Sequence, residues 1–140
     1  ENTSGQGREM GGRLEEVARI LELIGMPERT GGCIDTCHAF AAGYDLRSAA
    51  SVDEFVRDVD AAIGLERVFV MHLNDAKFGL GSKRDRHEHI GLGMIGEEGF
   101  RRIVTHPLLE GVAGVIETPV DDSESNLRNI NTLKRMRAGS

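Results

Sequence analysis

Asp35, His72 and Glu117 each follow a short apolar run of the kind found in buried strands. After a single strand, such a residue commonly caps the next helix. Three apolar runs that all end on a possible metal ligand favour a shared site instead. Carboxylates and imidazoles are donors that zinc accepts in proteins. We therefore predict a metal site where these three strands end.

Two carboxylate–histidine pairs lie close to these positions. His38 follows Asp35 after one helical turn's worth of chain, so a single turn can present both side chains to neighbouring ions. Asp85 and His87 flank Arg86, and alternate residues of an extended segment point to the same side. A lone pair of this kind is weak support for a metal site, so the prediction rests on the pairs and the strand ends together.

Other reactive side chains fit a metal site less well. Cys33 lies within an apolar run and Cys37 lacks a second C-x-x-C partner, so we expect both to be free, structural thiols. His89 and His106 neither follow a strand nor have a paired ligand spacing, and we expect them to face solvent. The glycine-containing stretch at residues 79–82 opens no helix, which excludes a typical dinucleotide-binding loop.

Helical and strand patterns alternate along the sequence and would position these donors. Apolar periodicity predicts helices at residues 14–24, 51–63, 100–104 and 127–133, and apolar runs predict strands at residues 33–35, 68–72 and 112–116. The second helix begins with a possible capping box at Ser51. Residues 74–93 show no periodicity, and we interpret them as a functional loop. This order predicts an α/β fold with three parallel strands and four helices.

Three strands are too few for a complete parallel β/α fold. A closed barrel needs eight strands, so we expect the others to lie upstream of Glu1, where the sequence starts without a methionine. The predicted fold is the C-terminal half of a (β/α)8 TIM barrel, and residues 1–140 are then part of a single domain. Active sites of such barrels lie at the C-terminal ends of the strands, where Asp35, His72 and Glu117 are expected.

The composition narrows the possible functions. A formal net charge of -6 argues against indiscriminate nucleic-acid binding, although bound cations would reduce the negative charge that a substrate meets. The sequence has no apolar run of about 20 residues and no export signal, so we expect no membrane partner. Two cysteines without a disulfide framework fit a cytoplasmic location.

Five segments resemble endonuclease IV, the zinc-dependent apurinic/apyrimidinic endonuclease family. They are "ENTSGQG" at the start, "CIDTCHAFAAGYD" from Cys33, "MHLNDAK" from Met71, "DRH" from Asp85 and "IET" from Ile116. They occur in the family's order, and the resemblance covers nearly the whole chain. It implies a DNA repair enzyme, a hydrolase that cuts the backbone of double-stranded DNA 5′ to abasic sites with up to three Zn²⁺ ions.

The resemblance also implies a role for each matching residue. Glu1 would bridge two ions; Asp35, His72 and Glu117 would bind one ion, and His38, Asp85 and His87 another. Glu1 or Glu117 would also be catalytic, accepting a proton from the attacking water. Independently of the resemblance, Lys77, Arg84 and Arg86 lie in the long loop, where we predict that they contact DNA phosphates without reading the base sequence.

Part of the family's site has no counterpart in this sequence. Two further zinc-binding histidines and the side chains that wedge into DNA belong to the family's N-terminal half. The N-terminal half barrel is therefore an expected partner, and we expect the chain to be inactive without it. Two alternatives remain, a metal-dependent sugar isomerase or epimerase barrel and a non-catalytic half barrel that only binds metal.

Overall fold

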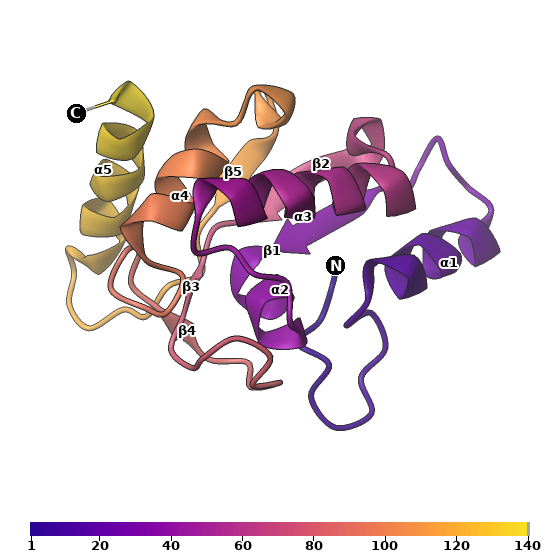
Figure 1. Cartoon of the computed structure of the whole chain (residues 1–140), viewed down its shortest axis with the longest axis horizontal. Coiled ribbons are helices and arrows are strands. Elements are labelled where there is room, and N and C mark those ends of the chain that lie inside the picture. Colours follow the sequence, from indigo (N-terminus) through magenta and orange to yellow (C-terminus); the bar gives the residue numbers. More distant parts are fainter. Residues whose placement is uncertain (140) are drawn as a thin grey trace.

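The computed structural model describes residues 1–139 (Figure 1). Within them, the helices are α1 (Leu14–Ile24), α2 (Thr36–Ala42), α3 (Ala49–Ala62), α4 (Gly96–Thr105) and α5 (Ser125–Ala138). The strands are β1 (Gly32–Asp35), β2 (Val68–His72), β3 (Asp75–Ala76), β4 (His87–Glu88) and β5 (Ala113–Val115). Two short 3₁₀ turns, η1 (Leu65–Arg67) and η2 (Pro107–Leu109), precede β2 and β5.

The main sheet has three parallel strands in the order β1-β2-β5. Asp35 pairs with His72, and His72 pairs with Val115, so the C-terminal ends of the strands lie at one edge. Helices α1, α3, α4 and α5 pack as successive neighbours along the sheet (Figure 1). This arrangement is half of a parallel β/α barrel, as the alternating patterns predicted.

The first long helix agrees with the sequence, whereas the second begins earlier than expected. Helix α1 buries one apolar stripe and ends at Gly25, whose φ of 66° suits the left-handed conformation of a helix stop. The cap of α3 is Ser48 rather than Ser51. The Ser48 hydroxyl accepts from the Ser51 amide at 3.2 Å, and the Ser51 hydroxyl accepts from the Ser48 amide at 3.1 Å. Two hydroxyls thus form the reciprocal cap that we had assigned one turn later.

Two predicted features of the fold were incomplete. The structure has five helices in residues 1–139 instead of four, because α2 begins directly after Asp35, whose carboxylate caps it by accepting from the His38 amide at 2.9 Å. The connection at residues 74–93 is not structureless. It contains an antiparallel pair of two-residue strands, β3 and β4, in which Ala76 lies opposite His87.

A buried carboxylate organises this connection. Asp75 is fully buried, and its two oxygens accept five backbone N–H donors. The donors are Ala76 at 2.8 Å, Ile95 at 2.9 Å, Gly91 and Gly93 at 3.0 Å, and Gly96 at 3.3 Å. Burial raises the pKa of Asp75, and these hydrogen bonds oppose the shift. The end of β2 is thereby connected to the chain that leads into α4.

The helices cover only one face of the main sheet. Ile34 and Met71 are buried on that face, where Phe55 of α3 is also buried. The opposite face, which corresponds to a barrel interior, is open, and Val115 there is 45% exposed. The N-terminal residues lie along β1, and the backbone N–H of Asn2 donates to the Cys33 carbonyl at 3.3 Å. No helix within residues 1–139 has the length and apolarity that a membrane span requires.

Candidate metal centre

Glu1, Asp35, His72 and Glu117 converge at the C-terminal edge of the sheet. His72 Nδ1 lies 3.1 Å from a Glu1 oxygen, 3.2 Å from a Glu117 oxygen and 3.8 Å from an Asp35 oxygen. One donor atom from each of the four residues lies within 4.8 Å of all the others. Parallel strand ends produce this convergence, because β1 and β2 supply neighbouring donors and Glu117 follows β5 by two positions.

His38, Asp85 and His87 form a second group beside the first. His38 Nε2 is 3.3 Å and His87 Nε2 is 3.5 Å from the same Asp85 oxygen. Helix α2 supplies His38, the β3–β4 connection supplies Asp85, and β4 begins at His87. The groups are adjacent, since His38 Nδ1 lies 3.2 Å from Glu1 and His87 Nε2 lies 3.8 Å from Asp35. The structure therefore brings together all seven residues that the family resemblance implies as ligands.

Backbone carbonyls orient two of the imidazoles. His38 Nδ1 lies 3.0 Å from the Asn2 carbonyl, and His87 Nδ1 lies 2.9 Å from the Glu117 carbonyl. A carbonyl only accepts, so each ring donates from Nδ1 and keeps the Nε2 lone pair free for a cation. His87 Nε2 is buried and has no hydrogen-bond partner within the described chain. An unpaired buried nitrogen is costly, and a bound cation would satisfy it.

The charges at the centre also suit a cation. Burial raises the pKa of Asp35, although His38 and the Asn74 side chain stabilise its charged form. Desolvation lowers the pKa of His38, but Asp35, the Asn2 carbonyl and Asp85 outweigh it, and the net shift is upward. Carboxylates held this close repel one another unless positive charge lies between them. Imidazole and carboxylate donors together match the preferences of zinc.

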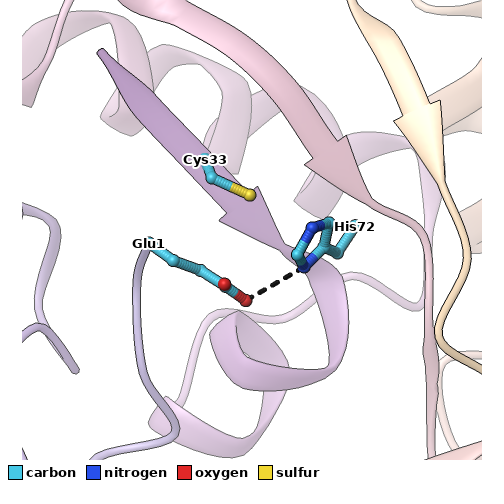
Figure 2. Close-up of side chains that lie close together, drawn as sticks. All are labelled: Glu1, Cys33 and His72. Atoms are coloured by element: carbon cyan, nitrogen blue, oxygen red, sulfur yellow. Dashed lines mark hydrogen bonds and ion pairs between the residues drawn. The ribbon is translucent and has the colours of Figure 1, made fainter. Parts of the chain in front are cut away.

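Both cysteines are free thiols close to this centre, as expected. Cys33 lies on β1 beside the Glu1–His72 pair (Figure 2). Burial and the Glu1 charge raise the pKa of Cys33 to about 11. Burial and Asp35 raise the pKa of Cys37 to about 12, and its sulfur lies 3.5 Å from the Arg86 carbonyl. Each thiol stays protonated at neutral pH, so neither is a ready nucleophile.

The three basic residues predicted to contact DNA lie in the same segment as Asp85. Lys77, Arg84 and Arg86 are exposed and lie on the β3–β4 connection. Arg84 stacks over the Phe78 ring at 3.5 Å, and Arg86 donates to the Asp85 carbonyl at 2.6 Å. These contacts hold two guanidinium groups at the rim of the candidate centre. Contact with DNA remains a prediction.

Two histidines that we expected at the surface are packed instead. His106 is only 6% exposed, and burial lowers its pKa. Its Nδ1 accepts from the Leu108 amide at 3.2 Å, which caps η2. His89 is half-buried, with Nε2 2.8 Å from Asp121 and Nδ1 3.0 Å from the Asn129 side chain. Both histidines fix loop ends through contacts to residues other than the seven donors, a role that local sequence spacing does not reveal.

The sequence reasoning missed two asparagines that contact the donors. Asn2 pairs with the backbone of Asp35, accepting from its amide at 2.7 Å and donating to its carbonyl at 3.2 Å. Asn74 donates to an Asp35 carboxylate oxygen at 2.6 Å and accepts from the Glu117 amide at 2.7 Å. Each asparagine lies within two positions of a predicted ligand in the sequence. This proximity was the signal that could have identified both residues as part of the site.

Comparison with known proteins agrees with this geometry. The sequence profile of the xylose isomerase-like TIM barrel family matches residues 1–138. The chain belongs to this family. Among solved structures, endonuclease IV from Thermus thermophilus superposes with a TM-score of 0.83 at 37% identity, over 99% of this chain and 49% of that one. The match in fold extends from one end of the half barrel to the other.

Within the family, the chain is similar to proteins named probable endonuclease 4. It is 50% identical to the protein from Methanoculleus marisnigri and 49% identical to that from Methanosphaerula palustris, over 97% of this chain in each case. The alignment covers 48% of either relative, so the chain spans about half the length of the curated relatives it matches. The resemblance to endonuclease IV seen in the sequence motifs is confirmed.

Proposed function

We propose that this chain supplies most of the catalytic centre of a zinc-dependent phosphodiesterase, an apurinic/apyrimidinic endonuclease that cuts double-stranded DNA 5′ to abasic sites. The observation that carries the proposal is the convergence of seven oxygen and nitrogen donors in two adjacent groups. The similar proteins are named as endonucleases, which supports cleavage of a nucleic-acid backbone. A cytoplasmic DNA repair enzyme also fits the two free thiols.

The two groups of donors would hold separate ions. Asp35, His72 and Glu117 would hold one ion and His38, Asp85 and His87 another, and Glu1 would contribute its carboxylate to the centre as well. Zinc would supply Lewis acidity, which lowers the pKa of water and neutralises charge on a phosphate. Within residues 1–139, His87 Nε2 is buried without a hydrogen bond and lies 3.5 Å from an Asp85 oxygen, which supports this assignment independently of the resemblance.

Side chains of this chain would accept the proton of the attacking water and bind the DNA phosphates. Glu117 is 51% exposed and Glu1 34% at the side chain, so either carboxylate can reach an attacking water and accept its proton. Arg86, Arg84 and Lys77 would bind the DNA phosphates on either side of the cut. Because these contacts are to the backbone, they position the duplex without selecting a base sequence.

The proposed enzyme needs a second half barrel. The resemblance assigns two more zinc-binding histidines and the DNA-wedging side chains to the family's N-terminal half. The open face of the sheet, on which Val115 is 45% exposed, would pack against that half. Residues 1–140 are then one part of a single barrel domain, and cleavage requires the partner half.

Metal binding can be tested before activity. We expect His72→Ala and His87→Ala each to lower the zinc bound per chain in equilibrium dialysis, since each removes a donor. His89→Ala is the matched control, because His89 contacts Asp121 and Asn129 instead of the seven donors. Unchanged zinc stoichiometry in both ligand variants would contradict the assignment.

Activity is tested with a duplex that carries one abasic site. The chain is incubated with zinc, with and without a separately expressed N-terminal half from an endonuclease 4 relative. Nicking 5′ to the abasic site is expected only in the mixture, and Glu117→Gln should abolish it. Cleavage by the chain alone would refute the dependence on the second half. A correctly assembled mixture that binds zinc but does not nick would favour a non-catalytic role.

A sugar isomerase or epimerase is the competing enzyme class. Such an enzyme needs one or two ions, whereas the His38, Asp85 and His87 group would form the third site of a three-ion centre. The same zinc-loaded mixture can be offered an aldose, with nuclear magnetic resonance to detect ketose or epimer. Turnover of the sugar without nicking of DNA would replace the nuclease proposal.

A further inference from the structure

Asn74 joins the ends of all three strands of the main sheet. It lies two positions beyond β2, the central strand, and is fully buried. Its side-chain nitrogen donates to Asp35 Oδ2 at 2.6 Å, at the end of β1. Its side-chain oxygen accepts from the Glu117 amide at 2.7 Å, just beyond β5. The side-chain amide of Asn74 therefore contacts two proposed ligands of one ion, Asp35 through its nitrogen and Glu117 through its oxygen.

The chemistry of these contacts requires an amide in one orientation. A carboxylate can only accept and a backbone N–H can only donate, so the nitrogen must face Asp35 and the oxygen must face Glu117. Reversing the amide would place oxygen against oxygen and hydrogen against hydrogen. Among side chains of this length, only asparagine offers both a donor and an acceptor at neutral pH.

Thr36 holds the backbone of Asn74 in place. The Thr36 hydroxyl accepts from the backbone N–H of Asn74 at 2.9 Å and donates to the backbone carbonyl of Asn74 at 2.7 Å. Thr36 is also fully buried and directly follows Asp35. The main chain and the side-chain nitrogen of Asn74 are therefore held from the junction of β1 and α2, which leaves the side-chain amide little freedom to follow a displaced ligand.

We propose that Asn74 is a positioning residue that sets the separation of Asp35 and Glu117 before an ion binds, and so determines metal affinity. This inference rests on the proposed metal centre and deepens it. Hydrogen bonds to a ligand carboxylate restrict its rotation and keep the coordinating lone pair directed at the ion. Removing such a contact typically weakens metal binding about 10- to 100-fold.

The test measures zinc affinity on the full chain by competition with a chromophoric chelator. Asn74→Leu keeps the branched shape of the side chain and removes both hydrogen bonds, and we expect its zinc dissociation constant to rise roughly 10- to 100-fold. The absorption spectrum of the cobalt-substituted chain should change as well, because it reports ligand geometry. Hydrogen exchange of the Glu117 amide should quicken in the metal-free chain. If Asn74→Leu does not fold, Asn74→Ser replaces it in the test. The serine side chain is too short for either contact, so we expect the same weaker zinc binding and faster exchange.

Asn129→Leu is the matched control for the loss of a buried asparagine. Asn129 is 4% exposed and accepts from the Ile90 amide at 2.9 Å, but it contacts none of the seven donors. We expect this variant to lose stability and keep its zinc affinity and cobalt spectrum. Wild-type zinc affinity in a folded Asn74 variant would overturn the inference, as would an equal loss in Asn129→Leu. If wild type binds no zinc, the proposed function itself fails.

Discussion

Replacing Asp75 by asparagine should destabilise the folded chain by about 2–4 kcal/mol. The Asp75 carboxylate accepts three N–H donors on Oδ2 and two on Oδ1. An amide has one oxygen, which can retain the three donors, so the two on the other side would face an NH₂ group. Each buried donor without a partner costs about 1–3 kcal/mol. The neutral amide is cheaper to bury than a carboxylate, and this gain keeps the estimate below the upper sum of about 6 kcal/mol.

The assay is urea unfolding followed by circular dichroism at neutral pH. A loss of about 2–4 kcal/mol is a large part of a typical total stability of about 5–15 kcal/mol, so the midpoint should fall clearly. Asp75→Ala should cost more, because all five donors lose their acceptor. Asp121→Asn is the control; its side chain is 70% exposed, and we expect a change within about 0.5 kcal/mol. The reasoning would be refuted if Asp75→Asn changed the unfolding free energy by no more than about 0.5 kcal/mol, or if Asp75→Ala destabilised the chain less than Asp75→Asn does.

Three further predictions concern other parts of the chain. Gly99→Ala should unfold α4 or shift it, because the added Cβ would collide with the Leu46 carbonyl; near-wild-type thermal melting would contradict this close approach. Asp122 should titrate with a pKa of about 2 by nuclear magnetic resonance, because Arg128 and the Glu124 backbone amide bind its charged form. The stability that this pairing contributes should be present above the ordinary pKa of 3.8 and disappear as the pH falls through about 2. A titration midpoint near 3.8 would exclude the pairing. The open sheet face, with Val115 45% exposed, should make the isolated chain self-associate or bind an apolar dye, and a monodisperse monomer without dye binding would show that the face is covered.

The elements that the sequence predicted well are those with one buried stripe or a continuous apolar run. Helix α1 buries Leu14, Val17 and Leu21 at helical spacing, and β2 is a run of apolar residues that ends at His72. The candidate centre was predictable for the same reason. Parallel strands end at a common edge, so donors at three strand ends must approach one another whatever the details of the loops.

The features that were missed depend on contacts between distant segments. Helix α2 is buried around most of its circumference, so it shows no amphipathic pattern. The β3–β4 pairing joins strands of two residues, which are too short to have a periodicity of their own. His106 and Asn74 are polar residues in buried positions, and only their tertiary hydrogen-bond partners explain why burial is tolerated.

The candidate centre also joins segments that are far apart in the chain. His72 and Glu1 are 71 positions apart, His38 and Asn2 are 36 apart, and His87 and Glu117 are 30 apart. Contacts of such long range form only after the entropy of closing each loop has been overcome. An ion bound by these residues would act as a reversible cross-link between the first, middle and last parts of the chain. At an ion concentration 100 times the dissociation constant, it would add about 2.7 kcal/mol to the stability of the folded state, so the amount of zinc bound would report how much of the chain had folded correctly.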